Sequence, residues 1–534
     1  VVGVSLFFLY LFVADAFGSF AAIIATTALA LYPMVFAESH MNIKDPVQMG
    51  YFTIAVVSAY FTAVRKHWLD WFVLLLLSVF LALGTKWNIV FLPLILAPWI
   101  VVVYKKSDIG QSIGWKRMIV LGLIAVIAPL ILLLLAYPFY WTQTVFKLLN
   151  TFDFYATLGV KDLSIQQATY APLPGGFDAR AILQIFSMSP PVMLVLAAIG
   201  VIGVIVRKVP GKHSAGLLVL LWLVVPLLRV IWQTSEFYGS MRNFMEFLPA
   251  LAVLVGIGSA WIVRKMPRVI GGAFLLLFIL IHVYILVRWH PYEHIYFNGL
   301  FGGLKGAEAK GLYTWETLYD APYRELANWL NTNADKGARL AYLDGTMLAL
   351  SPLWLRDDIR FGSYFSGLDA GGEYIASIVY PKPPAVFPIN YLESFVEPVY
   401  KVVVDGVVVA KIWKNDKTHT LYGGHRRVVG VNDLVVRSEI ASGAQRSDTL
   451  LPSPFRILSA TVEVSDIRCI TVRSLVWGTL KDGKVSYIVP WISPISDTRA
   501  TVSFPGVYGN GIQWWDREKA GCKSVNVLEI EGIE

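Results

Sequence analysis

A short run of ionisable and amide side chains separates two hydrophobic stretches near the start of the chain. Residues 38–45 (ESHMNIKD) place two carboxylates, an imidazole, an amide and an ammonium within eight positions. Such groups at a membrane face are costly unless they are solvated, paired or used. A solvated loop between helices is the simple explanation. The functional alternative is that Asp45 binds a metal ion or positions a sugar, with His40 and Lys44 near a phosphate.

Further cations lie near the ends of other hydrophobic stretches. Lys86 follows one stretch, Arg229 lies near the end of another, and Arg242 precedes a third. A guanidinium at a helix start adds its charge to the positive end of the helix dipole, which suits a phosphate. Glu236 and Tyr238 precede Arg242 in the same predicted loop and are candidate substrate contacts. The alternative for each cation is that its aliphatic stem lies along apolar surface while the charge extends to the interface.

The elements that hold these residues are helices of about the length that crosses a bilayer. The chain has 534 residues, of which 56% are hydrophobic, and its long apolar runs end near residue 288. A helix needs roughly 20 apolar residues to span the hydrocarbon core. The pattern predicts about ten spanning helices, at residues 1–14, 19–37, 47–64, 69–84, 88–104, 118–137, 190–206, 214–234, 244–263 and 269–288.

Lys and Arg are concentrated in every second connection between these stretches. The basic connections contain Arg65-Lys66, Lys105-Lys106, Lys116-Arg117, Arg207-Lys208, Lys212, Arg264-Lys265 and Arg268. By the positive-inside rule this set is cytoplasmic. The candidate residues and everything after Arg288 therefore face outward, in an integral multi-pass membrane protein. The net charge of +8 indicates this orientation and not a nucleic-acid partner.

The sequence after the last apolar run predicts two further domains. Residues 1–289 form the membrane domain, 290–416 an extracytoplasmic mixed α/β domain, and 417–534 an all-β, sandwich-like domain. Within the second, residues 321–333 have helical spacing, and residues 402–413 read as two strands joined by a turn at Asp405-Gly406. The compartment permits a disulfide between the two cysteines, Cys469 and Cys522, but the sequence leaves that bridge open.

Five stretches, in order along the chain, resemble the C-type glycosyltransferases, in particular the dolichyl-phosphate-mannose–protein mannosyltransferase and aminoarabinose transferase branch. They are LYPMVFAESHMNIKDP at 31–46, GTKWN at 84–88, YPFYW at 137–141, YGSMRNFMEFLP at 238–249 and HPYEHIYFNGLFGGLKGA at 290–307. In the first stretch, the residues that match the family pattern are Pro33, His40, Asn42, Lys44 and Asp45. In the fourth stretch, Asn243 departs from the family pattern, since relatives often carry His or Tyr at that position.

The resemblance implies a membrane enzyme that transfers a sugar from a polyprenyl-phosphate donor to an acceptor hydroxyl, with inversion, at the extracytoplasmic face. Asp45 would be an acid of the second external loop. The donor phosphate would be bound by Lys86, Arg242, Lys44 and Arg229, and the substrate by His40, Asn42, Glu236 and Tyr238. The family's main catalytic carboxylate precedes this region. Because the chain begins at Val1 inside an apolar run without a Met, we expect that carboxylate upstream.

The partners implied are a polyprenyl-phosphate-linked sugar, the bilayer and an acceptor that is a protein, a lipid or a glycan. No cofactor is required by the motifs, and a divalent cation, Mg²⁺ or Mn²⁺, at Asp45 is left open. Two other functions are also left open. A transporter for a lipid-linked solute is expected to show repeats and mid-membrane charges. A carbohydrate-binding anchor would stack sugars on Trp477, Trp491, Trp514 or Trp515, although tryptophans in a β domain are more often core.

Overall fold

The chain forms two compact units in a computed structural model that describes residues 1–65, 67–106, 115–157, 180–206, 213–231, 240–312, 321–341, 350–379, 386–421, 425–441, 444–471, 475–481, 483–516 and 525–534. The first, here called the helical unit, comprises Val1–Tyr319 with Asp405–Val407. The second, the β-rich unit, comprises Asp320–Val404 and Val408–Glu534. The predicted boundaries at 289 and 416 stay predictions.

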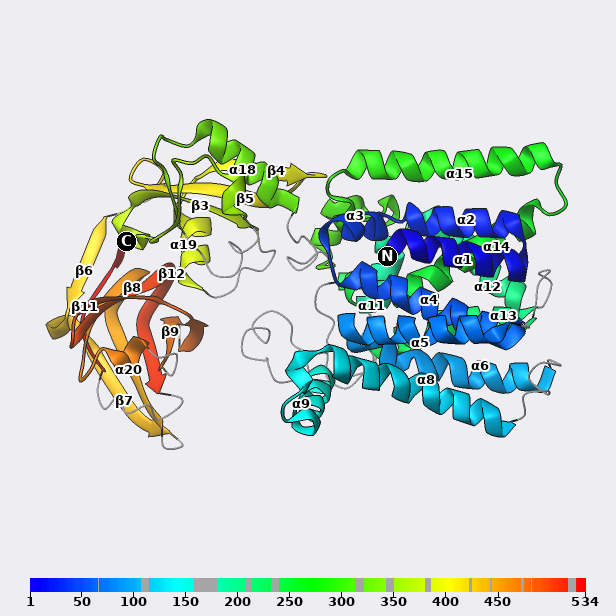
Figure 1. Ribbon diagram of the computed structural model, residues 1–534. Coiled ribbons are helices and arrows are strands. Elements are labelled where there is room, and N and C mark those ends of the chain that lie inside the picture. The colour runs from blue at the N-terminus through cyan, green and yellow to red at the C-terminus, as the bar shows by residue number, and fades with distance from the viewer. Residues whose placement is uncertain are drawn as a thin grey trace. The chain divides into compact units, whose positions relative to one another are not determined.

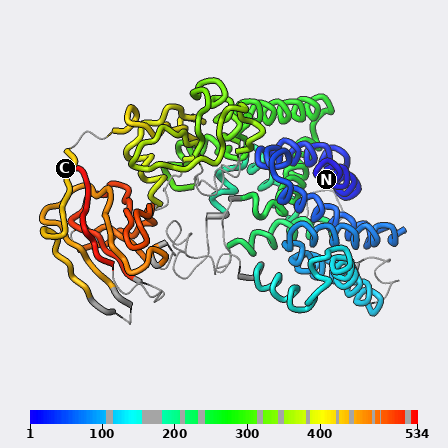
Figure 2. The backbone as a smooth tube through the Cα atoms, turned by 60° about the vertical axis from the view of Figure 1, so that its left-hand side comes forward, coloured from blue at the N-terminus to red at the C-terminus, as the bar shows by residue number. Residues whose placement is uncertain are grey.

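The helical unit consists of apolar helices that run side by side (Figures 1 and 2). Its α-helices are α1 (Val2–Phe17), α2 (Ser19–Ala30), α3 (Pro33–Met41), α4 (Asp45–Val64), α5 (Trp68–Thr85), α6 (Leu92–Lys106), α8 (Trp115–Ala136), α9 (Thr144–Thr157), α11 (Arg180–Met188), α12 (Pro191–Ile205), α13 (His213–Ile231), α14 (Leu248–Val263), α15 (Arg268–Trp289) and α16 (Gly303–Ala309). Its 3-10 segments are η1 (Trp87–Phe91), η2 (Pro138–Tyr140), η3 (Ser240–Phe247), η4 (Glu293–Ile295) and η5 (Gly299–Phe301).

Seven spans among the described residues are long and apolar enough to cross a membrane, or eight if the bent pair α2–α3 counts as one. They are Asp45–Val64, Trp68–Thr85, Trp87–Tyr104, Trp115–Ala136, Ser214–Ile231, Met241–Val263 and Arg268–Trp289. The protein is therefore a multi-pass membrane protein, as predicted. The predicted count of about ten stays a prediction, because α1 and α12 are apolar but only 16 and 15 residues long.

The prediction of one helix over 19–37 is wrong. The chain forms α2 and α3 instead, bent by 56° at the break between them. Tyr32 has an extended backbone (φ −69°, ψ 123°) directly before Pro33, and a residue before proline is disfavoured in the α region. The prediction of a loop over 38–46 is also wrong. Helix α3 continues to Met41 and α4 begins at Asp45, so only residues 42–44 connect them.

Glycines allow the central helix α14 to contact its neighbours at backbone distance. A Cβ on Gly258 would lie 2.0 Å from the carbonyl oxygen of Leu196 on α12, and one on Gly256 would lie 2.3 Å from that of Ala21 on α2. Small residues at such positions favour helix association in a bilayer, because they permit close packing. Helices α2, α12 and α14 therefore form the tightly packed centre of the helical unit.

The β-rich unit begins with a mixed α/β region. Its elements are α18 (Ala321–Asn333), β1 (Arg339–Ala341), η7 (Pro352–Trp354), β2 (Arg360–Ser363), η8 (Gly367–Asp369), β3 (Gly371–Ile378), α19 (Phe387–Phe395), β4 (Pro398–Val404) and β5 (Val407–Asp416). The sheet order is β2-β1-β3-β5-β4, with β1 parallel to β2 and to β3. The predicted helix at 321–333 is confirmed as α18. The predicted turn is also confirmed, with positive φ at Asp405 (47°) and Gly406 (80°).

The remaining strands form a second, continuous sheet. Its elements are β6 (Arg426–Gly430), η9 (Val431–Asp433), β7 (Val435–Ala441), β8 (Ala444–Val464), α20 (Arg468–Thr471), β9 (Leu475–Lys481), β10 (Lys484–Ile488), β11 (Trp491–Ser496), β12 (Arg499–Asp516) and β13 (Val525–Ile533). The main order is β10-β9-β12-β8-β13-β6, with β11 paired to β12 and β7 to β8. The prediction of a β-rich C-terminal region is thus confirmed. The sandwich-like arrangement stays a prediction.

The apolar core of this sheet contains Trp477 and Trp514, both buried. They therefore offer no stacking surface to a sugar, whereas Trp491 and Trp515 are only partly buried. The carbohydrate-binding alternative thus keeps two of its four tryptophans. A second apolar cluster joins the two sheets, since Phe365 of the α/β region and Leu458 of β8 belong to it. The bridge between the cysteines stays open, because Cys522 lies outside the described residues.

Helix α19 packs on β12 at a position that accepts only glycine. A Cβ on Gly506 would lie 2.0 Å from Phe395, and its φ is +74°. We expect Gly506→Ala to lower the free energy of unfolding by about 1–3 kcal/mol more than Gly483→Ala, because overpacking adds to the backbone strain. Gly483 is the matched control, with a φ of +75° and no atom within 4 Å of the added Cβ. Thermal unfolding of both purified variants measures the difference, and equal values would contradict the packing argument.

Stability of the β-rich unit is expected to depend on pH through Asp358. Arg356 donates to this carboxylate, and so does the backbone N–H of Gly337 at 2.7 Å. These donors lower the pKa of Asp358 to about 2, against about 3.9 in an unfolded chain. The lowered pKa contributes stability above pH about 4, and this contribution is lost as the pH falls toward 2. Asp358→Asn is therefore expected to unfold at a lower temperature than the wild type at pH 6, and this difference in melting temperature is expected to shrink at low pH. A difference that stays constant with pH would contradict this role of Asp358.

Candidate functional site

The side chain of Asn42 organises the turn between α3 and α4. Its Nδ2 donates to Glu38 Oε2 at 2.7 Å and to Asp45 Oδ2 at 2.8 Å. Its Oδ1 accepts the backbone N–H groups of Lys44 at 2.9 Å and of Asp45 at 3.1 Å. Because Glu38, Asn42 and Asp45 are all buried, the interpretation as a solvated loop does not hold for these three residues. The residues between them that are exposed are Ser39, His40, Ile43 and Lys44.

Asp45 forms a buried ion pair with Lys86. Asp45 is the first residue of α4, and Lys86 follows the last residue of α5. Lys86 Nζ donates to Asp45 Oδ1 at 2.7 Å, and the two side chains are only 13% and 4% exposed. The alternative that the Lys86 ammonium extends to the lipid–water interface is therefore wrong. A buried pair of this kind requires further hydrogen bonds to offset the loss of hydration.

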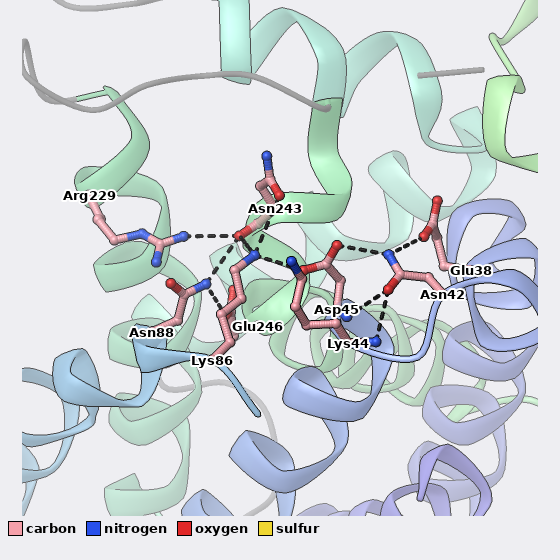
Figure 3. A network of polar contacts seen from close by, with 9 residues as sticks. All are labelled: Glu38, Asn42, Lys44, Asp45, Lys86, Asn88, Arg229, Asn243 and Glu246. Carbon is pink, nitrogen blue, oxygen red and sulfur yellow. Dashed lines mark hydrogen bonds and ion pairs between the residues drawn. The ribbon is translucent and has the colours of Figure 1, made fainter. Parts of the chain in front are cut away.

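Those further bonds converge on the backbone carbonyl of Asn243. Its oxygen accepts from Lys86 Nζ at 3.2 Å, from Asn88 Nδ2 at 3.1 Å and from Arg229 Nη2 at 3.3 Å. Figure 3 shows these three side chains approaching the same oxygen. Asn243 lies in η3, and the backbone leaves helical geometry at the next residue, Phe244 (φ −138°, ψ 35°). Because the helix is interrupted here, the carbonyl of Asn243 is available to side-chain donors.

The predicted helix over 244–263 is preceded by η3 and begins as α14 at Leu248. Arg242 therefore lies inside a 3-10 segment, near the start of the span Met241–Val263 but before the first turn of α14. The residue is half-buried and immediately precedes Asn243. The structure thus brings Asp45, Lys86 and Arg229 together in one network, and places Arg242 on the segment that supplies the shared carbonyl.

Four members of the network were not among the predicted site residues. They are Glu38, Asn88, Asn243 and Glu246. Glu246 is buried; its Oε1 accepts from Asn88 Nδ2 at 2.6 Å, and its backbone oxygen accepts from Trp222 Nε1 at 2.7 Å. A carboxylate inside a hydrophobic span is itself a signal of function, so Glu246 could have been found in the sequence. Asn88 carries no such signal.

Of the other predicted residues, Lys44 joins the network through its backbone N–H. The side chains of His40 and Lys44 are exposed. His40 Nδ1 lies 2.7 Å from the backbone oxygen of Phe36. The same His40 lines a cavity of about 380 Å³, together with Ser39 and Asn42. The remaining two candidates, Glu236 and Tyr238, lie outside the described residues.

The arrangement around Asp45 does not fit a metal ligand. Both of its carboxylate oxygens accept hydrogen bonds, Oδ1 from Lys86 and Oδ2 from Asn42. The ammonium of Lys86, at 2.7 Å, occupies the position that a cation would take. Among the described residues, no cluster of three or more His, Cys, Asp or Glu side chains is placed to hold a metal ion. We therefore assign Asp45 to charge pairing.

Comparisons with known proteins give low similarity. No protein-family model matches the sequence, and no curated protein matches it. Among solved structures, ArnT from Cupriavidus metallidurans bound to undecaprenyl phosphate is 13% identical, with 78% of this chain and 83% of that chain covered and a TM-score of 0.40. The Archaeoglobus fulgidus oligosaccharyltransferase in its apo form is 9% identical, with 95% and 85% covered and a TM-score of 0.36.

The arabinofuranosyltransferase AftD from Mycobacteria is 11% identical, with 99% of this chain and 51% of that chain covered and a TM-score of 0.34. All three are C-type glycosyltransferases, the family that the sequence motifs resemble. The TM-scores are low, so the geometry of the site itself carries the functional conclusion.

Proposed function

We propose that the protein is a membrane glycosyltransferase that uses a polyprenyl-phosphate-linked sugar. The observation that carries this proposal is the convergence of Lys86, Asn88 and Arg229 on one carbonyl oxygen. A carbonyl oxygen has two lone pairs, so three N–H donors exceed what it can satisfy. A phosphate has several charged oxygens and matches donors that carry two positive charges. The sequence resemblance independently supports the same ligand.

The contacts of Lys86 support exchange of the carbonyl for a ligand. An ammonium has three N–H donors, and those of Lys86 reach Asp45 Oδ1 at 2.7 Å, Asn243 O at 3.2 Å and Asn243 Oδ1 at 3.4 Å. The two contacts to Asn243 are long and correspondingly weak. A phosphate oxygen can replace them while the short contact to Asp45 is retained. Asp45 then acts as a positioning residue that holds the ammonium in place.

The proposed reaction is a single displacement at the anomeric carbon of the sugar. The bond from that carbon to the phosphate oxygen breaks, and a bond from the acceptor oxygen forms on the opposite face, which inverts the configuration. Lys86 and Arg229 would stabilise the charge that develops on the departing phosphate. The acceptor hydroxyl loses its proton to a carboxylate. We do not assign that role to Asp45, because both of its carboxylate oxygens are engaged.

The site is proposed to face the extracytoplasmic side. Helix α4 begins at Asp45, and Arg65 follows its last residue. The network and Arg65 therefore lie at opposite ends of one span. Since Arg65 belongs to the basic set that the positive-inside rule places in the cytoplasm, the network faces outward. The proposed acceptor is a protein, lipid or glycan on that side.

The test is binding of polyprenyl monophosphate to the protein in nanodiscs. Arg229→Gln is expected to weaken binding by about 10- to 100-fold, because a hydrogen bond to a charged group contributes about 1.5–3 kcal/mol. Arg65→Gln is the matched control, since Arg65 pairs with Asp15 at the other end of α4 and is half exposed. Calorimetry or native mass spectrometry measures both constants. Unchanged affinity in Arg229→Gln would contradict phosphate binding at the network.

A further inference from the structure

Helix α9 presents an apolar stripe that nothing in the described part of the chain covers. Val145, Leu149 and Phe152 are 72%, 62% and 59% exposed. Their spacing of four and three residues places them on one face of the helix. Exposed apolar surface of this kind, arranged along one helix face, marks a contact with a partner protein or with a membrane.

Hydrogen bonds fix which way this helix faces. Lys147 Nζ donates to the backbone oxygen of Phe139 at 2.7 Å and to Thr142 Oγ1 at 2.8 Å. Thr151 Oγ1 lies 3.2 Å from the hydroxyl of Tyr140. These three contacts hold Lys147 and Thr151 of α9 against the turn that contains η2. The apolar stripe is therefore directed away from the protein.

The helix begins where a lipid-facing span ends. Only 11% of the span formed by α8 is buried inside the protein, and Figure 1 shows α9 at the end of α8. The last turn of α8 exposes Leu135, whose backbone oxygen accepts from the indole of the exposed Trp141 at 3.1 Å. Tyr137 donates from its hydroxyl to the backbone oxygen of Gly84 at 3.0 Å. Trp and Tyr at the end of a span are typical of the membrane–water interface.

We propose that α9 lies in the plane of this interface, with Val145, Leu149 and Phe152 among the acyl chains. Lipid contacts the stripe, because the stripe continues the lipid-facing surface of α8. Burial of apolar area and not attraction to anionic headgroups drives the contact. The charged residues between 144 and 154 are Lys147 and Asp153, of opposite sign, and Lys147 is held by the protein.

The position of α9 also sets the depth of Lys86 in the polar network. The meaning of that depth rests on the function proposed above. Gly84 lies two residues before Lys86 at the end of α5, and Tyr137 joins it to the start of the α9 region. A helix held at the level of the headgroups would therefore hold Lys86 at the depth of a lipid phosphate. The location of α9 itself does not depend on that function.

Spin-label accessibility in nanodiscs tests the location. Leu149→Cys and Asn150→Cys are labelled in the full chain with Cys469→Ser and Cys522→Ser, and Leu123→Cys on α8 provides a lipid-facing reference. Asn150 is the comparison position, because it is exposed and lies one residue away, about 100° around the helix from Leu149, on the face that also carries Phe146 and Phe154. We expect the label at position 149 to collide several-fold more often with oxygen than with a water-soluble nickel chelate. The label at 150 is expected to show a smaller excess of oxygen over nickel collisions, in neutral and in anionic lipid alike.

Equal nickel accessibility at positions 149 and 150 would overturn the proposal, since the stripe would then face water. Protection of position 149 from both reagents would also overturn it, because protein would then cover the stripe. If the cysteine-free background does not fold, the wild-type chain is irradiated in vesicles that contain a photoactivatable phosphatidylcholine. Cross-links within residues 144–154 are then expected, and their absence while α8 is labelled would contradict the proposal.

Discussion

Lys86→Met is expected to lower the free energy of unfolding by about 3–5 kcal/mol, because it leaves the buried carboxylate of Asp45 without its partner. The 2.7 Å contact and the 4% exposure of Asp45 are the reasons for this large value. Thermal or denaturant unfolding of the protein in detergent measures it. The control is Arg65→Gln, whose pair with Asp15 is half exposed and is expected to contribute no more than about 1 kcal/mol.

The double variant Asp45→Asn/Lys86→Met separates charge burial from a general loss of packing. Removing both charges leaves no unpaired ion, so most of the lost stability is expected to return. An amide at position 45 also retains an oxygen and a nitrogen for the hydrogen bonds of the turn. If the double variant were as unstable as Lys86→Met alone, the ion pair would not be the source of the effect.

The same double variant is expected to transfer sugar about 10²- to 10³-fold more slowly than the wild type, since one preorganised donor to the leaving phosphate is lost. Because its stability is restored, the loss cannot be attributed to unfolding. Initial rates with a polyprenyl-phosphate sugar donor give kcat/KM for the variant and the wild type, with Arg65→Gln as the control that retains activity. Wild-type kcat/KM in the double variant would exclude Lys86 from the reaction and, with it, the proposed use of the network.

The positions of the apolar helices could be predicted from the sequence, because burial in lipid leaves a long run of hydrophobic residues. The break between α2 and α3 could not be found from that signal, since hydropathy does not register a change in backbone direction. Pro33 was the available indication, because it disfavours helical geometry at Tyr32. On this ground, Pro33 divides the predicted helix 19–37.

In the candidate site, Asp45, Lys86 and Arg229 could be predicted because charged side chains next to apolar helices are conspicuous. Their shared acceptor could not, since it is a backbone carbonyl and carries no residue-type signal. Its availability depends on the irregular backbone at Phe244 within η3. The orientation of the Asn42 side chain likewise depends on α3 ending at Met41, one turn later than the sequence pattern indicated.

The glycine contacts of α14 bear on how the site admits a ligand. With a Cβ at Gly258 only 2.0 Å from a carbonyl of α12, α14 has little freedom to slide, and η3 lies within the same span, which is 83% buried. The spans on either side of Lys86, the second of which contains Asn88, are only 33% and 28% buried. The site is therefore expected to open by movement of α5 and η1, which displaces lipid molecules instead of protein. Turnover is then expected to slow as the surrounding bilayer becomes more viscous.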